Sequence, residues 1–275
     1  MRITILLILV SLAACSNVFF QPQKIQYMTP DNIGIKYEEV RFHSADGLVL
    51  YGWFLPAQGE AKGTVLFLHG NAENISTHIG NVYWLPAQHY NVFLPDYRGY
   101  GGSEGSPTLA GVQDDINSAL AYLLKRTDID TQRIVILGQS LGGAAAIYNV
   151  AHSPYRANIK ALIEESAFSD YRGIAREKLA SFWLTWPLQW PLSLTIDNDY
   201  SPLPVVNNVS PIPLLIIHGD KDKVVPLAHG QALYAAAAQP KEMWVVEGGG
   251  HIEAFRHKEY QIRLLEYLAR VLPNN

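Results

Sequence analysis

Short apolar runs alternate with longer stretches of helical periodicity from about residue 35 to the end of the chain. The apolar runs are rich in β-branched and aromatic residues and predict strands at residues 37–42, 48–55, 64–68, 91–95, 134–137, 161–164, 214–218 and 243–247. Asp46-Gly47 splits the first two runs, which predicts an antiparallel hairpin. Because helical patterns separate the other runs, the chain predicts an α/β fold with a mostly parallel eight-stranded sheet flanked by helices.

The helical stretches are recognised by the spacing of their apolar residues. Residues 111–125 carry Val112, Ile116 and Leu120 on one face, and residues 257–271 repeat the pattern. Residues 171–213 depart from this rhythm, since they are rich in proline and aromatic residues. We interpret this stretch as a small lid. Its candidate pocket residues are Phe182, Trp183, Trp186 and Trp190.

The N-terminus has the layout of a secretory signal. Arg2 precedes an apolar run at residues 3–10, which is followed by the small residues Ala13 and Ala14. A run of this length is too short to span a bilayer, for which about 20 residues are needed. Residues 1–14 are therefore expected to be a signal peptide.

Leu12-Ala13-Ala14-Cys15 resembles the lipobox of bacterial lipoproteins, in which the cysteine is lipidated after cleavage. Cys15 is the only cysteine in the chain. We expect residues 15–34 to be a lipidated cysteine and tether, followed by the folded domain at 35–275. Because Ser16 rather than aspartate follows, the expected location is the cell envelope, at the outer membrane facing the periplasm. An ordinary cleaved signal or a core cysteine is the alternative.

The composition of the chain argues against several classes of function. The 275 residues include 21 Lys and Arg against 25 Asp and Glu, which leaves no basic surplus to bind nucleic acid. A single cysteine excludes an internal disulfide and a cysteine-based zinc site, and no metal site is expected. The oligomeric state stays open.

Gly138-Gln139-Ser140-Leu141-Gly142 fits the G-x-S-x-G pattern. It follows a predicted strand directly and precedes a helical run, which is the strand–turn–helix setting of a nucleophile elbow. A serine hydroxyl needs a general base, and the base needs an acid that orients it. The sequence therefore predicts that Ser140 is a nucleophile.

Candidates for the acid and the base follow two later strands, in the chain order that elbow enzymes use. Asp220 and Asp222 come after the strand at 214–218, and His251 follows three glycines after the strand at 243–247. The carboxyl ends of parallel strands share one edge of a sheet, where α/β proteins place their sites. His251 is the expected base, and the residues alone leave both aspartates open.

Residues 35–272 resemble the α/β-hydrolase family. The likeness is greatest to its serine-aminopeptidase-like or Bem46-like branch, which carries H-G-N-x-x-N and D-Y-R-G-Y-G, here His69 to Asn74 and Asp96 to Gly101. The family's acid lies in H-G-x-x-D-x-x-V-P, which maps onto Asp222 rather than Asp220. We expect the Asp96 to Gly101 loop to have a structural role, in which its arginine and aspartate tie together loops near the site.

The oxygen of a tetrahedral intermediate needs two aligned hydrogen-bond donors. One is expected to be the backbone N–H of Leu141, the residue after the nucleophile. The resemblance implies that the backbone N–H of Asn71 is the other, with Ala72 as the alternative. It implies no cofactor.

The expected function is hydrolysis of small-molecule carboxylic esters or thioesters with apolar acyl groups, through Ser140, His251 and Asp222 and an acyl-enzyme. Two alternatives remain: a peptidase or amidase acting on short peptides or cell-wall amides, and a lipoprotein that only binds a ligand. The expected contact with a membrane is the lipid anchor at Cys15, and the lid aromatic residues are a second candidate for such contact.

Overall fold

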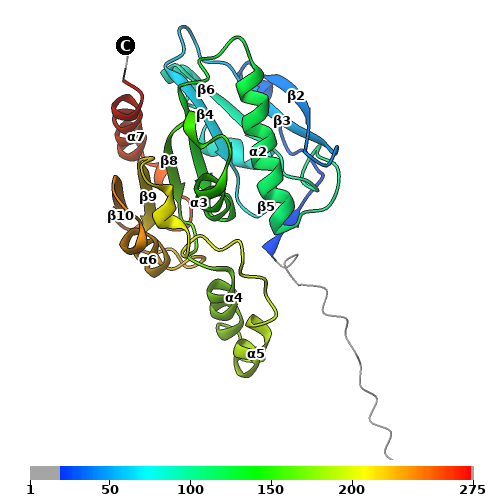
Figure 1. Ribbon diagram of the computed structural model, residues 1–275, viewed down its shortest axis with the longest axis vertical. Coiled ribbons are helices and arrows are strands. Elements are labelled where there is room, and N and C mark those ends of the chain that lie inside the picture. Colours follow the sequence, from blue (N-terminus) through cyan, green and yellow to red (C-terminus); the bar gives the residue numbers. More distant parts are fainter. Residues whose placement is uncertain (1–18, 274–275) are drawn as a thin grey trace, which may run out of the picture.

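A computed structural model of the protein describes residues 19–273, which are built around one large sheet (Figure 1). Its strands are β2 (Glu38–His43), β3 (Val49–Leu55), β4 (Gly63–Leu68), β6 (Tyr90–Pro95), β7 (Ile134–Gln139), β8 (Ile159–Glu165), β9 (Leu214–Gly219) and β10 (Lys241–Val246). Their order across the sheet is β10-β9-β8-β7-β4-β6-β3-β2. Only β2 with β3 and β3 with β6 are antiparallel. The predicted mostly parallel eight-stranded sheet is confirmed.

Helices cover both faces of the sheet (Figure 1). They are α1 (Ile75–His78), α2 (Leu109–Lys125), α3 (Leu141–His152), α4 (Tyr171–Ala180), α5 (Gln189–Ser193), α6 (Leu227–Ala236) and α7 (Lys258–Val271). Short 3₁₀ turns lie at Pro30–Ile33, Ile79–Asn81, Pro86–Gln88, Arg156–Asn158, Trp186–Leu188, Val206–Val209 and Ala254–Arg256.

The central strands are apolar throughout because both of their faces are covered. In β4, Leu66 and Leu68 pack with the residues of α2 and α3, while Val65 and Phe67 pack with those of α1 and α7. Alternate side chains of a strand point to opposite faces, so a strand between two helix layers reads as one continuous apolar run. The sheet thus has one core on each side.

The proline- and aromatic-rich stretch at residues 171–213 forms a lid between β8 and β9. Its helices α4 and α5 project away from the sheet (Figure 1). Since β8 ends at Glu165, the chain leaves the carboxyl edge of the sheet to build the lid. This is the edge at which the candidate site residues were expected.

A second, small parallel sheet joins the N-terminal segment to the body. β1 (Gln21–Pro22) pairs with β5 (Ala72–Glu73), and Phe20 is buried. The segment expected as a tether therefore packs on the domain from Phe19 onward. The expected signal peptide at 1–14 and the lipidation site Cys15 lie outside the described residues. Within residues 19–273, no helix has both the length and the apolar character needed to cross a membrane.

Candidate active site

Ser140 occupies a sharp turn between β7 and α3. Its backbone has φ 53° and ψ −116°, a conformation that costs about 1–3 kcal/mol in a residue with a side chain. Its N–H donates to the carbonyl of Glu165 over 2.8 Å, which pins the turn to β8. The structure therefore has the strained elbow that G-x-S-x-G predicts.

The two glycines of the motif permit the elbow because other backbone atoms pass very close to them. A Cβ on Gly142 would lie 2.2 Å from the carbonyl oxygen of Leu68, and one on Gly138 would lie 2.5 Å from that of Gly142. Real Cβ atoms essentially never come nearer than 3.0 Å. Strand β4, the elbow and helix α3 can therefore pack together only with glycine at these positions.

We expect Gly142→Ala to destabilise the protein by about 1–3 kcal/mol, because the added methyl group forces backbone atoms of β4 and α3 apart. Gly80→Ala is the matched control, since nothing lies within 4 Å of a Cβ at Gly80. Thermal unfolding of both variants measures the difference. Equal Tm values for the two variants would contradict the close approach at Gly142.

Asp222 lies in the loop after β9 and contacts His251 directly. Its Oδ2 accepts a hydrogen bond from His251 Nδ1 over 2.7 Å, and its Oδ1 accepts the N–H groups of Val224 and Val225, each over 2.8 Å. Burial alone raises the pKa of the Asp222 carboxyl, but the hydrogen bonds from His251 and the two amides outweigh it and hold the pKa below its usual range. Asp222 is thus a carboxylate, and His251 presents Nε2 as an acceptor.

Asp220 supports the loop that carries the histidine and does not contact the histidine itself. Its carboxylate is exposed and accepts the N–H of Gly248 over 2.7 Å, at the start of the glycine loop that carries His251. His218 supports the neighbouring acid loop by contacting the carbonyl of Val225 over 2.8 Å. The structure therefore brings Asp222, rather than Asp220, to the histidine.

Two consecutive residues at the end of β8 connect the serine and histidine loops. The carbonyl of Glu165 accepts the N–H of Ser140, its carboxylate accepts the N–H of Ala254 over 2.8 Å, and Ser166 Oγ accepts the N–H of Ile252 over 3.3 Å. Burial raises the pKa of Glu165 to about 7. The carboxyl of Glu165 thus holds the histidine loop against the elbow.

No hydrogen bond joins the Ser140 hydroxyl to His251 among the described residues. In hydrolases without substrate this bond is often long, and it tightens when the substrate binds. The shared attachment to Glu165 and Ser166 keeps the two loops adjacent in the meantime.

The loop after β4 offers a second hydrogen-bond donor beside the elbow. His69 Nδ1 contacts the carbonyl of Gly70 over 2.7 Å, and burial lowers the pKa of His69 to about 3, so its neutral ring donates this bond. Tyr100 donates to the carbonyl of Asn71 over 2.7 Å, and Gln21 N–H donates to the same oxygen. Both peptide groups that flank Asn71 are therefore fixed.

The N–H groups of Asn71 and Leu141 donate to no acceptor among the described residues, and both residues line one pocket. Buried amides are almost always paired, so two free amides at one pocket wall fit a site that awaits an acceptor. Ala72, the alternative donor, lies in β5 and does not line the pocket.

Backbone strain is concentrated around these loops. Five non-glycine residues in the described part of the chain have positive φ, and four of them lie at the site: Glu73, Ser140, Ser166 and Ile252. Such conformations persist where the surrounding structure enforces them, and they cluster at functional sites. This distribution points to the same location as the hydrogen bonds.

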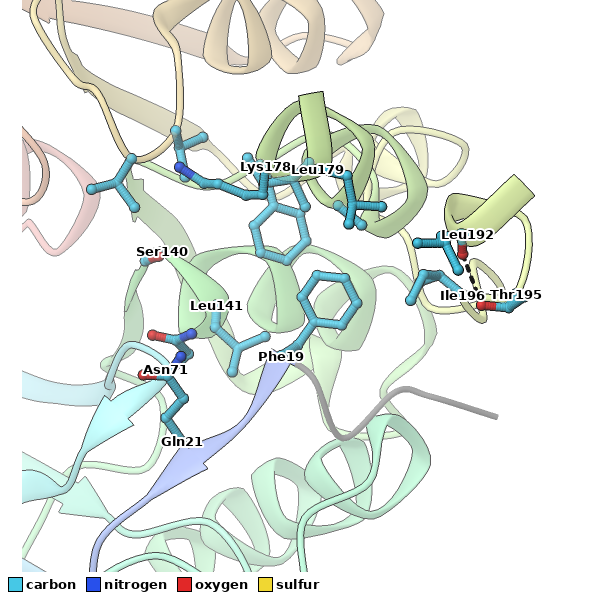
Figure 2. Close-up of a pocket in the computed structure, with 15 residues that line it drawn as sticks. Phe19, Gln21, Asn71, Ser140, Leu141, Lys178, Leu179, Leu192, Thr195 and Ile196 are labelled. Atoms are coloured by element: carbon cyan, nitrogen blue, oxygen red, sulfur yellow. Dashed lines mark hydrogen bonds between the residues drawn. The ribbon is translucent and has the colours of Figure 1, made fainter. Parts of the chain in front are cut away.

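A pocket of about 630 Å³ opens beside Ser140 (Figure 2). Ser140, Asn71 and Leu141 lie at one end, and Leu192 and Ile196 of the lid lie at the other. Its lining is mainly apolar and consists of Phe19, Gln21, Asn71, Ser140, Leu141, Phe168, Ile174, Ala175, Lys178, Leu179, Leu192, Thr195, Ile196, Val224 and Val225. Lys178 is the single ionisable side chain among them.

The aromatic residues expected to line this pocket do not do so. Phe182, Trp183, Trp186 and Trp190 are 52%, 76%, 60% and 61% exposed, and none belongs to the lining. Helix α4 instead turns its aliphatic face inward, with Ile174, Ala175 and Leu179 spaced along one side. The lid does border the pocket, through residues other than its aromatic ones.

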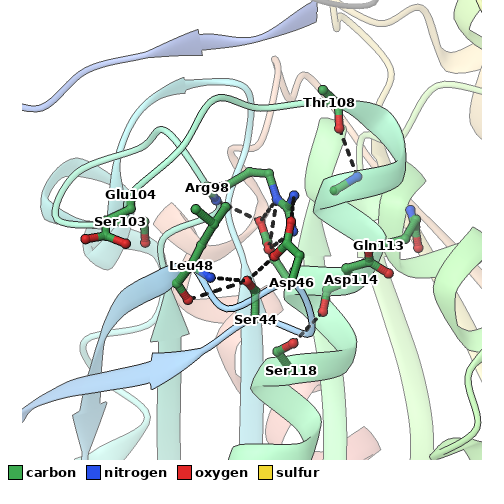
Figure 3. A network of polar contacts seen from close by, with 12 residues as sticks. Ser44, Asp46, Leu48, Arg98, Ser103, Glu104, Thr108, Gln113, Asp114 and Ser118 are labelled. Atoms are coloured by element: carbon green, nitrogen blue, oxygen red, sulfur yellow. Dashed lines mark hydrogen bonds and ion pairs between the residues drawn. The ribbon is translucent and has the colours of Figure 1, made fainter.

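The Asp96 to Gly101 loop ties the surrounding elements together, as its structural role predicts. Arg98 donates to Asp115 of α2 over 2.8 Å and to Asp46 of the β2–β3 turn over 2.9 Å (Figure 3). Tyr97 donates to the carbonyl of His69 over 3.1 Å. This loop thereby fixes the position of the loop that carries Asn71.

The part of the chain that the structure describes contains no group of three or more His, Cys, Asp or Glu side chains placed to hold a metal ion. A strained serine, a carboxylate-bound histidine and two amides without an acceptor are groups that can support acyl transfer.

Comparison with known proteins places the chain in a family. The sequence profile of the prolyl oligopeptidase family matches residues 76–274. The YfhR protein of Escherichia coli is 38% identical over 267 residues, which cover 94% of this chain and 89% of YfhR. The α/β hydrolase domain-containing protein WAV2 of Arabidopsis thaliana is 36% identical over 219 residues, covering 77% of this chain and 70% of WAV2.

Among solved structures, a Pyrococcus furiosus esterase superposes with a TM-score of 0.74 and 23% identity, covering 92% of this chain and 98% of the esterase. At this level of identity the likeness establishes a shared fold, while activity has to be argued from the site.

Proposed function

The chain belongs to the prolyl oligopeptidase family of α/β hydrolases, and from this we propose that it is a serine hydrolase of carboxylic esters with apolar acyl groups. Ser140 is the proposed nucleophile, His251 the general base and Asp222 the acid that orients it. The observation that carries this proposal is the position of Ser140, on a strained elbow at one end of a mainly apolar pocket.

The proposed reaction proceeds in two steps. Ser140 Oγ attacks the acyl carbon while His251 Nε2 takes its proton, and Asp222 stabilises the resulting imidazolium. The N–H groups of Leu141 and Asn71 bind the oxyanion, where each such donor is worth about 2.7–4 kcal/mol. The alkoxide leaves with the proton from His251, and water then hydrolyses the acyl-enzyme by the same route.

The lining of the pocket supports an apolar acyl group. Phe168, Ile174 and Leu179 form walls with no polar side-chain atoms. Each methylene buried there contributes about 0.8 kcal/mol, so binding favours longer acyl chains until the pocket is filled.

We expect kcat/KM for p-nitrophenyl esters to rise about fourfold with each added methylene until the pocket is full, as this transfer energy predicts. Leu179→Trp narrows the pocket and should shift the preferred ester to shorter chains, while hydrolysis of the acetate is retained. Leu184→Trp is the matched control, because Leu184 is 59% exposed and does not line the pocket. If kcat/KM changed neither with the length of the acyl chain nor in Leu179→Trp, that result would contradict an apolar acyl pocket.

Hydrolysis of short peptides is a second candidate, which the family match itself favours. Lys178, the ionisable residue of the pocket, is placed to pair with a substrate carboxylate. A higher kcat/KM for aminoacyl amides than for alkyl esters would select this candidate over the ester hydrolase.

A further inference from the structure

Large apolar side chains are exposed together at the outer end of the lid. Of the fifteen such side chains exposed in the described part of the chain, eight lie between residues 182 and 194. We call this set the lid tip; it consists of Phe182, Trp183, Leu184, Trp186, Leu188, Trp190, Leu192 and Leu194. Scattered exposed apolar residues are ordinary, whereas a contiguous group marks a surface that another molecule covers.

The chemistry of the lid tip fits a lipid surface. Residues 181–196 contain no ionisable side chain, and three of the eight tip residues are tryptophan, which concentrates at the boundary between water and lipid. Cationic groups lie on the helix that precedes the tip: the Arg176 guanidinium stacks 4.3 Å from the centre of the Trp190 ring, and Lys178, whose Nζ donates to the carbonyl of Lys223, follows on the same helix. An aromatic tip backed by cations is complementary to an anionic bilayer surface.

The acidic residue of the same helix points elsewhere. Glu177 Oε2 lies 3.3 Å from His229 Nε2 of α6, so its charge faces the body of the protein. The next acidic residues, Asp197 and Asp199, follow the tip on the return segment. Arg176 is therefore the charged residue of α4 that contacts the tip, through its stacking on Trp190.

The N-terminal segment joins the fold beside the lid. Phe19 packs on Tyr171 at the start of α4, with ring centroids 4.9 Å apart, and it lines the pocket together with Leu192. Phe19, the first residue that the structure describes, therefore lies beside the lid.

We propose that the lid tip inserts into the interface of a lipid bilayer and presents the mouth of the pocket to the lipid. Leu192 belongs to both the tip and the pocket lining, so the apolar surface is continuous from the bilayer to the site. Ester substrates then enter the pocket from the bilayer. Their entry rests on the proposed function, whereas the docking of the lid tip does not.

Tryptophan fluorescence of the full chain on vesicles tests the docking. The vesicles consist of phosphatidylcholine and phosphatidylglycerol with brominated acyl chains, which quench only tryptophan inserted among them. Since three of the six tryptophans belong to the tip and Trp53 and Trp244 are buried, we expect about half of the emission to be quenched. The variant Trp183→Ser, Trp186→Ser, Trp190→Ser should lose this quenching.

The matched control is Tyr83→Ser, Val245→Ser, Ile262→Ser, which removes three exposed apolar side chains from other elements and should keep the quenching. Trp183→Ser alone gives a second variant, because a side chain 76% exposed is not needed for folding, and it should reduce the quenching by about a third. Unquenched emission from vesicle-bound wild type would overturn the docking. So would a concentration-dependent dimer that shields the same tryptophans from an aqueous quencher.

Hydrolysis of two esters separates docking from function. The triple tip variant should hydrolyse a water-dispersed short ester at the wild-type rate and a vesicle-embedded ester at least about tenfold more slowly. Equal rates for tip and control variants on the embedded ester would overturn entry from the bilayer. Quenching without hydrolysis of either ester would support the docking and overturn the proposed function.

Discussion

Ser140→Ala is expected to lower kcat/KM for the preferred ester by about a million-fold, the scale on which serine hydrolases respond to loss of their nucleophile. The methyl group of alanine cannot attack the acyl carbon, while the Asn71 and Leu141 amides and the apolar pocket remain. Alanine fits the elbow as well as serine does, since the Ser140 side chain supplies no cap to α3. Steady-state hydrolysis together with thermal unfolding therefore separates lost chemistry from lost structure.

A serine outside the site provides the control. Ser153 is buried beyond the carboxyl end of α3, where its hydroxyl donates to Asn117 over 2.7 Å. The same hydroxyl accepts the N–H of Tyr155 over 3.2 Å. Ser153→Ala should therefore lower stability by about 1–3 kcal/mol, the net worth of two hydrogen bonds, and leave kcat/KM within about twofold. Similar losses of activity in both variants would indicate that Ser140 acts through the fold rather than as the nucleophile.

Asp222→Asn is expected to lower kcat about ten-thousand-fold with little change in KM. The amide oxygen can still accept the N–H groups of Val224 and Val225, but the amide nitrogen then faces His251 Nδ1 and donates to it. The histidine proton moves to Nε2, the atom that must take the proton from Ser140. Pre-steady-state and steady-state hydrolysis with a p-nitrophenyl ester measure this loss.

Asp220→Asn is the matched control for the same chemical change two residues away. Asparagine at 220 keeps an oxygen for the N–H of Gly248, so the histidine loop retains its support. We expect kcat to change by less than about threefold. A larger loss in Asp220→Asn than in Asp222→Asn would reverse the assignment of the acid.

Local patterns predicted the sheet and the elbow because both depend on neighbouring residues. The inner strands of the sheet, such as β7, are buried on both faces and therefore read as apolar runs, and Gly138, Ser140 and Gly142 carry the elbow within five residues. The choice of Asp222 over Asp220 needed the family resemblance, since both follow the same strand. In the structure the hydrogen bond to His251 distinguishes them.

Features set by distant contacts were missed. β1 and β5 contain two residues each, too few to show any period, and they form only by pairing with each other. The carboxylate of Glu165 bonds Gln139 and Ala254, 26 and 89 residues away in sequence. Aromatic content predicts that the tryptophan-rich face of the lid lines the pocket. The face that does line it carries Ile174, Ala175, Lys178 and Leu179, whose spacing places them on one side of α4.

Covalent labelling of the folded protein with a fluorophosphonate, followed by mapping of the modified peptide, tests the central claim most directly. Such probes react with a serine only where a base activates it and an oxyanion site stabilises the adduct. We predict one adduct, on Ser140, which is absent in Ser140→Ala, slowed in Asp222→Asn and unchanged in Asp220→Asn. A folded protein that takes no label, or takes it on another residue, would contradict a serine hydrolase acting through Ser140.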